Sequence, residues 1–155
     1  MNKEQQIKEM LNVLSYNLYM VKITSIDIFE VELKAIKTNC KNNYIDFIPK
    51  NLKDLFMHTI SYLSTEYYEG VYDILKELET LLIRKNKDYN NSFDKTVAEY
   101  GYVVIAIRLE DKINRLKNLK NNKNQVTNES IKDTLLDIAG YCVLSLIYLE
   151  NKELK

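Results

Sequence analysis

Acidic side chains recur every fourth residue near the C-terminus, at Glu129, Asp133 and Asp137. In an α-helix this spacing places them along one stripe, because residues four apart lie nearly above one another. The surrounding segment, residues 128–149, is apolar on nearly every side, which is typical of a helix at the centre of a protein or in an interface. Buried carboxylates are costly unless a cation or a hydrogen-bond donor satisfies them. The stripe therefore indicates a candidate functional site.

A second charged group lies in residues 93–119, where apolar residues recur at helical spacing. On the predicted helix, Asp111 lies on the same side of the apolar stripe as three cationic side chains. These cations are Arg108, Lys112 and Arg115. Such a mixture of acids and bases is what a metal and phosphate site requires.

The two groups would form one site if the two predicted helices packed antiparallel, which the short polar connection between them permits. Asp111, Asp133 and Asp137 would then offer the oxygen ligands that Mg²⁺ or Mn²⁺ prefers. An alternative that needs no ligand is a bundle with internal salt bridges, in which Asp133 or Asp137 pairs with Arg108 or Arg115. The pattern alone leaves both interpretations open.

Helical periodicity extends over most of the chain. One segment is ambiguous, because Phe29, Val31 and Leu33 also alternate as in a strand, but we favour a helix. Gly70 is expected to divide the longest segment. The predicted helices cover about residues 3–22, 24–37, 52–85, 93–119 and 128–149, with polar loops at 38–50, 86–92 and 120–128.

The composition indicates an all-α helical bundle. The 155 residues fit a single domain and include only one Pro and three Gly. Acidic and basic residues are equal in number, 22 each, so no whole-protein field would attract nucleic acid or an anionic membrane. The sequence shows neither an apolar run long enough to span a bilayer nor the apolar segment of a signal peptide. We therefore expect a cytoplasmic protein.

Three common kinds of site are not predicted. Cys40 and Cys142 lack CxxC spacing, which argues against a zinc site or a disulfide framework. The single histidine, His58, has no Ser or Cys elbow nearby, which argues against a catalytic triad and favours a partly buried helical residue. The three glycines are isolated, so no glycine-rich phosphate loop is present.

Three sequence blocks occur in order between about residues 81 and 149: LLIRKNKDYNNSF, RLEDKINRL and ESIKDTLLDIAGY. Together they resemble the nucleotide-modification-associated domain of type one, a phage and bacterial group related to the all-α, MazG-like nucleoside triphosphate pyrophosphohydrolases. Residues 1–70 have no counterpart and would be additional N-terminal helices. The resemblance implies a MazG-like bundle that forms a homo-oligomer, either a dimer or a tetramer, and binds a nucleotide together with Mg²⁺ or Mn²⁺.

The activity that the resemblance implies is cleavage of a nucleoside triphosphate to a monophosphate and pyrophosphate. The implied metal ligands, which are also the catalytic acids, are Asp111, Asp133 and Asp137. The implied substrate contacts are Lys87, Asp88, Tyr89, Arg108, Lys112 and Arg115. Glu129 is left out of this set, because an acid in the first turn of a helix is explained by the helix dipole.

The chain departs from this pattern at two positions. Asn90 stands where the family usually has glycine, and Thr134 occupies the place of a glutamate in the ExxD motif of the better-known pyrophosphohydrolases. Fewer acidic ligands imply weaker metal binding, another phosphate substrate or no catalysis. Our prediction is a Mg²⁺-dependent nucleoside triphosphate pyrophosphohydrolase. The alternatives are a protein that sequesters a nucleotide or signalling molecule without cleaving it, and a structural helical oligomer.

Overall fold

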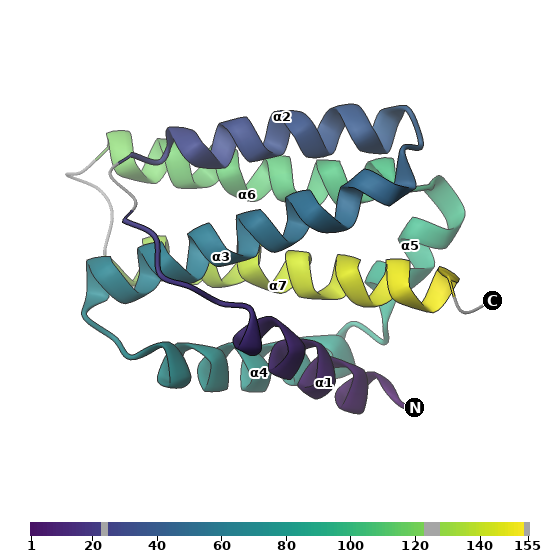
Figure 1. Cartoon of the computed structure of the whole chain (residues 1–155), viewed down its shortest axis with the longest axis horizontal. Helices are drawn as coiled ribbons and strands as arrows, with labels where there is room; N and C mark the ends of the chain where they lie inside the picture. The colour runs from purple at the N-terminus through teal and green to yellow at the C-terminus, as the bar shows by residue number, and fades with distance from the viewer. Residues whose placement is uncertain (23–24, 123–127, 154–155) are drawn as a thin grey trace.

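The computed structural model describes residues 1–22, 25–122 and 128–153. Within these ranges all regular structure is helical, which confirms the predicted all-α fold (Figure 1). None of the described helices is both long enough and apolar enough to cross a membrane. The elements are α1 (Lys3–Tyr16), α2 (Asp27–Lys41), a short 3-10 helix η1 (Ile45–Phe47), α3 (Ile48–Tyr67), α4 (Val71–Asp88), α5 (Ser92–Tyr100), α6 (Val103–Asn121) and α7 (Asn128–Glu153).

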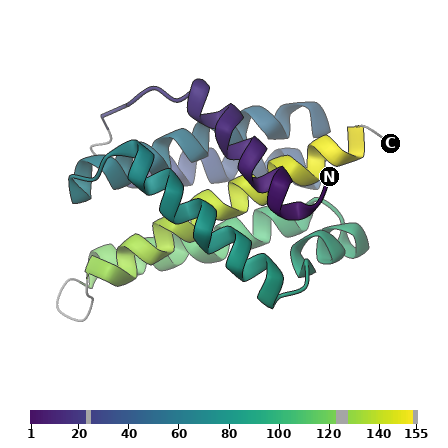
Figure 2. The ribbon, with the colours of Figure 1, turned by 90° about the horizontal axis from the view of Figure 1, so that it is seen from below.

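The central element is α7, which packs against α1, α3, α4, α5 and α6. On one side of α7, α2 lies along α3 and α6, and on the other side α1 and α4 cross it (Figures 1 and 2). The neighbouring helices α6 and α7 run in opposite directions, the arrangement that the short connection between them permits. Two charged groups that are distant in sequence are therefore carried by adjacent helices.

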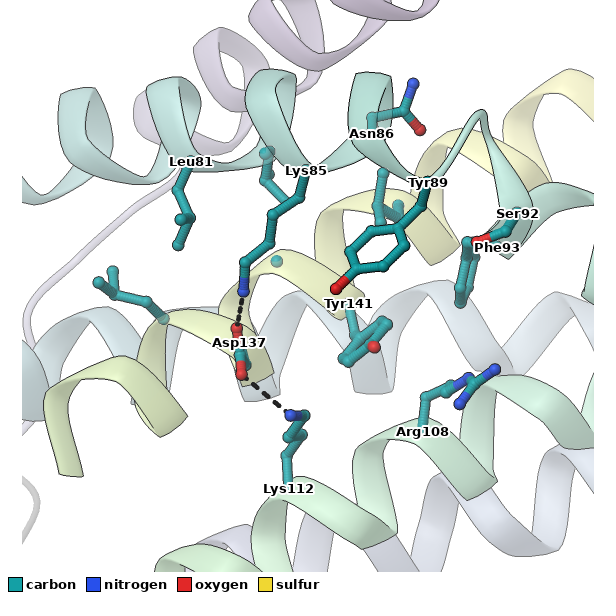
Figure 3. A pocket seen from close by; sticks show the side chains of 14 residues that line it. Leu81, Lys85, Asn86, Tyr89, Ser92, Phe93, Arg108, Lys112, Asp137 and Tyr141 are labelled. Carbon is teal, nitrogen blue, oxygen red and sulfur yellow. Dashed lines mark hydrogen bonds and ion pairs between the residues drawn. The ribbon is translucent and has the colours of Figure 1, made fainter. Parts of the chain in front are cut away.

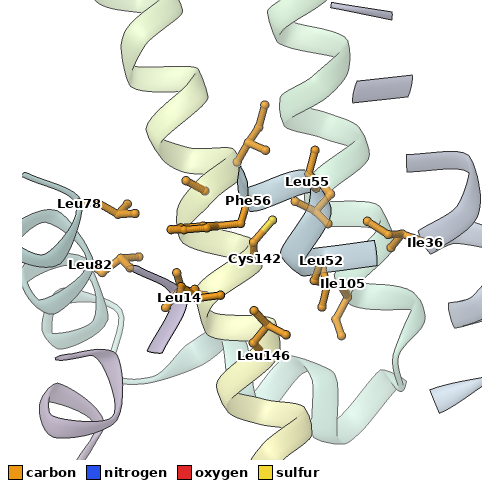
Figure 4. Packing of buried hydrophobic residues seen from close by; sticks show 14 of the residues in the cluster. Leu14, Ile36, Leu52, Leu55, Phe56, Leu78, Leu82, Ile105, Cys142 and Leu146 are labelled. Atoms are coloured by element: carbon orange, nitrogen blue, oxygen red, sulfur yellow. The ribbon is translucent and has the colours of Figure 1, made fainter. Parts of the chain in front are cut away.

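The core surrounds α7, which explains why its sequence is apolar on nearly every side. Cys142 and Leu146 point into this core, between Leu82 from α4 and Leu52 from α3 (Figure 4). Phe56, also from α3, is almost completely buried in the same cluster. A buried side chain of this size contributes about 1.5–3 kcal/mol through the hydrophobic effect. The helices of residues 1–70 are thus an integral part of the core.

The prediction of one continuous helix over residues 93–119 is wrong, because the chain turns between α5 and α6. Gly101 ends α5 with φ 87° and ψ −177°, a conformation that is essentially limited to glycine. Its carbonyl oxygen then accepts a hydrogen bond from the Val104 N–H in the first turn of α6. The break gives α5 its own direction, so that its first turn lies beside the pocket described below.

Two of the predicted loops are shorter than expected. In the first, α2 continues to Lys41 and α3 already begins at Ile48, because Pro49 sits in the first helical turn, where a missing N–H costs nothing. In the second, α4 continues to Asp88, and the chain then turns through Asn90 and Asn91, which have φ values of 50° and 57°. Asparagine tolerates this left-handed conformation better than most residues.

The remaining boundaries follow the predictions more closely. The ambiguous segment after residue 24 is helical, and Gly70 does separate two helices, as the N-cap of α4. The first helix is shorter than predicted and ends at Tyr16. Of the predicted loop at 120–128, residues 123–127 lie outside the described residues.

Candidate functional site

A pocket of about 350 Å³ lies between α4, α5, α6 and α7 (Figure 3). Its walls combine charged and aromatic side chains with the apolar surface of α7. The charged and aromatic residues that line it are Lys85, Tyr89, Phe93, Arg108, Lys112, Asp137 and Tyr141. Its volume lies at the lower end of the range of small-molecule sites, which begins at about 300 Å³.

Asp137 lies between two lysines that come from different helices. Its Oδ1 atom is 2.8 Å from Lys85 Nζ on α4, and its Oδ2 atom is 3.0 Å from Lys112 Nζ on α6 (Figure 3). The aspartate side chain is 17% exposed. Because each carboxylate oxygen contacts one ammonium group, the charge that was unexplained on an apolar helix is satisfied.

The approach of α4 to α7 depends on Gly140. A Cβ atom added at this residue would lie 2.8 Å from Leu82 Cδ2, closer than real Cβ contacts. The glycine therefore lets Leu82 pack directly on the backbone of α7. One turn further along, α4 carries Lys85 in its last turn, where a cation also interacts favourably with the helix dipole. These contacts place the Lys85 ammonium group over Asp137.

The other end of the pocket is aromatic. The rings of Phe93 and Tyr141 pack with their centroids 5.9 Å apart and their planes tilted by 38°. Phe93 is buried, Tyr141 is half-buried, and Tyr89 is exposed at the rim. Arg108 lies on the α6 side of the same space (Figure 3). The pocket thus has a cationic part and an aromatic part within reach of one ligand.

Four of the residues proposed from the sequence line this pocket together. They are Tyr89, Arg108, Lys112 and Asp137. The other five are not among its lining residues and are exposed at the surface: Lys87, Asp88, Asp111, Arg115 and Asp133. The Lys87 Nζ atom is 3.7 Å from Glu4 Oε2, and Lys87 lines a separate pocket between α1 and α4.

The three aspartates predicted as metal ligands do not form a cluster in this chain. Among the residues that the structure describes, no group of three or more His, Cys, Asp or Glu side chains is placed to hold a metal ion. Asp111 and Asp133 are exposed, and both oxygens of Asp137 contact lysines. The residues present therefore do not fit a three-carboxylate metal site. The arrangement is closer to the salt-bridge alternative, although the partners are lysines and not the arginines expected from the sequence.

Sequence reasoning missed Lys85, Phe93 and Tyr141. Lys85 lies in LLIRKNKDYNNSF, the first of the three blocks that resemble the family. It precedes Tyr89 by four residues, and residues four apart share a helix face. This spacing could have linked the two residues as parts of one wall. No comparable signal marks Phe93 and Tyr141, because an aromatic residue in a helix is most often part of the core.

A pair of titratable side chains, His58 and Glu32, lies between α2 and α3, outside the lining of this pocket. His58 Nδ1 is 3.9 Å from Glu32 Oε1, and both side chains are largely buried. Burial lowers the pKa of His58. Burial, together with the nearby charge of Asp54, raises the pKa of Glu32. His58 is a partly buried helical residue, as the sequence predicted.

Residues 85–149 match the family model described as nucleotide modification associated domain 1. This match confirms the resemblance to that domain, and its range includes all the charged and aromatic pocket residues, from Lys85 to Tyr141. A relation to MazG-like enzymes stays a prediction. No curated protein and no solved structure matches the chain.

Proposed function

We propose that residues 85–149, the part that matches nucleotide modification associated domain 1, form a nucleotide-binding site in the pocket between α4, α5, α6 and α7. The observation that carries this proposal is the combination of three cationic side chains with an aromatic wall in one pocket. The cations are Lys85, Arg108 and Lys112. Arginine and lysine bind phosphate oxygens through charge-assisted hydrogen bonds.

The aromatic part of the pocket suits the base. Phe93 and Tyr141 already form a packed pair, and the exposed ring of Tyr89 at the rim could cover a base that enters beside them. Stacking on an aromatic ring is worth about 1–3 kcal/mol per base and tolerates different bases. In this account the base lies near α5, and the phosphate group lies between α4 and α6.

A second candidate is the Mg²⁺-dependent pyrophosphohydrolase of MazG-like type. One observation favours it: the Asp137 carboxylate lies among cations that would also stabilise charge developing on a phosphoryl group. Asp111 and Asp133 lie outside the pocket lining, so the predicted set of catalytic acids is incomplete there. This candidate includes the homo-oligomer that the resemblance implies, in which a second copy would supply the further carboxylates.

The two candidates are separated by measuring binding and cleavage on the same samples. Purified protein is titrated in a calorimeter with mono-, di- and triphosphates of canonical and modified nucleosides, with Mg²⁺ present, while pyrophosphate release is assayed in parallel. We expect saturable binding heat for at least one nucleotide. Pyrophosphate release that is lost in Asp137→Asn would support the hydrolase. Absence of both signals across the panel would contradict both candidates and favour the structural oligomer.

A further inference from the structure

The lining of the nucleotide pocket carries an excess of positive charge. It includes three cations, Lys85, Arg108 and Lys112, and one carboxylate, Asp137, which gives a formal charge of 3 − 1 = +2. This excess is available to an anionic ligand without any added ion. A bound metal ion would add further positive charge, but the pocket lining offers such an ion only one carboxylate ligand, Asp137.

We propose that this pocket binds the phosphate group of its ligand without a divalent cation, through Lys85 and Lys112, and that Asp137 is an internal anion which the phosphate displaces. The inference rests on the proposed nucleotide-binding function and specifies how that site recognises phosphate. It differs from the metal site implied by the family resemblance, because the two lysines supply the positive charge that a metal would supply.

The contacts of Asp137 support this assignment. Its Oδ1 atom accepts a hydrogen bond from Lys85 at 2.8 Å, and its Oδ2 atom forms an ion pair with Lys112 at 3.0 Å. A metal ion bound at this carboxylate would lie beside both ammonium groups, whose positive charges would repel it. Two ammonium groups converging on one carboxylate instead form a geometry that also suits a phosphate, which presents several acceptor oxygens.

Displacement of Asp137 is feasible because its ion pairs are not deeply buried. The Lys85 side chain is 42% exposed and the Lys112 side chain is 26% exposed. The Asp137 side chain is 17% exposed, so these ion pairs are partly buried, and they are easier to exchange than fully buried pairs. Each ammonium group has three donors, so a lysine can contact phosphate while its bond to Asp137 weakens. A ligand with two or more negative charges therefore competes effectively for these lysines.

Asp137→Asn tests the displacement step, because it keeps the side-chain shape and removes the competing charge. The matched control is Asp133→Asn, which removes the same charge one turn earlier on α7, from an exposed side chain outside the pocket lining. The probe is inorganic pyrophosphate, titrated into each protein by calorimetry, first in EDTA and then in Mg²⁺. Thermal melting shows whether each variant is folded.

We expect the unaltered protein to bind pyrophosphate in EDTA. Asp137→Asn should bind it at least about fivefold more tightly, since a nearby like charge has been removed. Asp133→Asn should change the affinity by less than about twofold, because its charge is exposed and screened. Lys85→Gln and Lys112→Gln should each weaken binding in EDTA by about tenfold, and these variants decide the question if Asp137→Asn does not fold.

Binding that requires Mg²⁺, or binding that becomes weaker in Asp137→Asn, would overturn this inference while leaving the nucleotide-binding function intact. No pyrophosphate binding in EDTA would overturn it in the same way if the nucleotide panel still gives binding heat. If neither pyrophosphate nor any nucleotide binds, the proposed function fails as well.

Discussion

The Lys85 ammonium group lies 2.8 Å from Asp137 Oδ1 and so joins the last turn of α4 to the middle of α7. Lys85 is also the first residue of the matched family segment, whereas Asp137 lies near its end. The contact therefore joins the two ends of the matched segment at the pocket. Residues of α5 and α6 form the remaining walls of this pocket.

Tyr89→Ala should weaken nucleotide binding without destabilising the fold. The ring is 67% exposed at the rim of the pocket, so its removal should change the free energy of unfolding by less than about 0.5 kcal/mol. Loss of a stacking partner should cost about 1–3 kcal/mol of binding free energy, which is measured by calorimetric titration. Tyr89→Phe should retain the affinity. Equal binding by the alanine variant would exclude Tyr89 as a base contact.

Gly101→Ala should destabilise the protein by about 1–3 kcal/mol, as measured by urea unfolding. No atom lies within 4 Å of the added Cβ, so the cost would arise from the backbone conformation, with φ 87° and ψ −177°. The matched control is Gly70→Ala, where φ −66° and ψ 143° suit any residue. That change should cost less than about 1 kcal/mol, the typical loss at an N-cap. Equal effects at the two positions would contradict the role given to Gly101.

Gly140→Ala should destabilise the protein by about 1–3 kcal/mol through overpacking, because the new Cβ would lie 2.8 Å from Leu82 Cδ2. In a Leu82→Ala background the obstructing atom is absent. The same substitution should then stabilise the protein by up to about 1 kcal/mol, since alanine is the better helix former. Urea unfolding of the four proteins in this double-mutant cycle measures the coupling. An unchanged cost in both backgrounds would contradict the close approach of α4 and α7.

Glu32→Gln should stabilise the protein at pH 8 and have little effect at pH 4. Burial, and after it the charge of Asp54, raises the pKa of Glu32 above its ordinary value of 4.5. As the pH rises from 4.5 through the native pKa, the unfolded chain releases this proton first, so the contribution of Glu32 to stability is lost. Glutamine keeps the shape without the charge and should remove that loss.

The measurement for Glu32 is the free energy of unfolding of both proteins between pH 4 and pH 8. His58 acts in the opposite direction, because its lowered pKa makes the unfolded chain bind the proton first as the pH falls below 6.5. The difference between the two curves reports Glu32 together with its coupling to His58, because His58 Nδ1 lies 3.9 Å from Glu32 Oε1. A gain from Glu32→Gln that is constant across this range would show that the native pKa is not raised.

Helical periodicity was sufficient to predict the all-α fold, and the short connection permitted the antiparallel packing of α6 and α7 that the structure shows. The same pattern assigned Lys112 and Asp137 to one predicted site, and these two side chains are in contact in the structure. It could not decide whether Asp111 and Asp133 face the pocket, because the direction of a helix face depends on how far the helix is rotated against its neighbours. Both side chains are exposed in the folded chain.

The role of Lys85 was not predictable in this way. Its position over Asp137 depends on the approach of α4 to α7 at Gly140, which is a tertiary contact between segments far apart in the sequence. The break between α5 and α6 was missed for a different reason. An isolated glycine in a helical pattern is usually tolerated, and the sequence does not show that Gly101 adopts a positive φ.

The most direct test of the nucleotide site is a comparison of Lys85→Gln with Lys76→Gln, using a nucleotide that binds to the unaltered protein. Lys76 is an exposed lysine on the same helix but outside the pocket lining, so the two variants lose the same charge from α4. Calorimetric titration should show affinity reduced about tenfold or more in Lys85→Gln and nearly unchanged in Lys76→Gln. Equal affinity in both variants would contradict the assignment of this pocket as the nucleotide site.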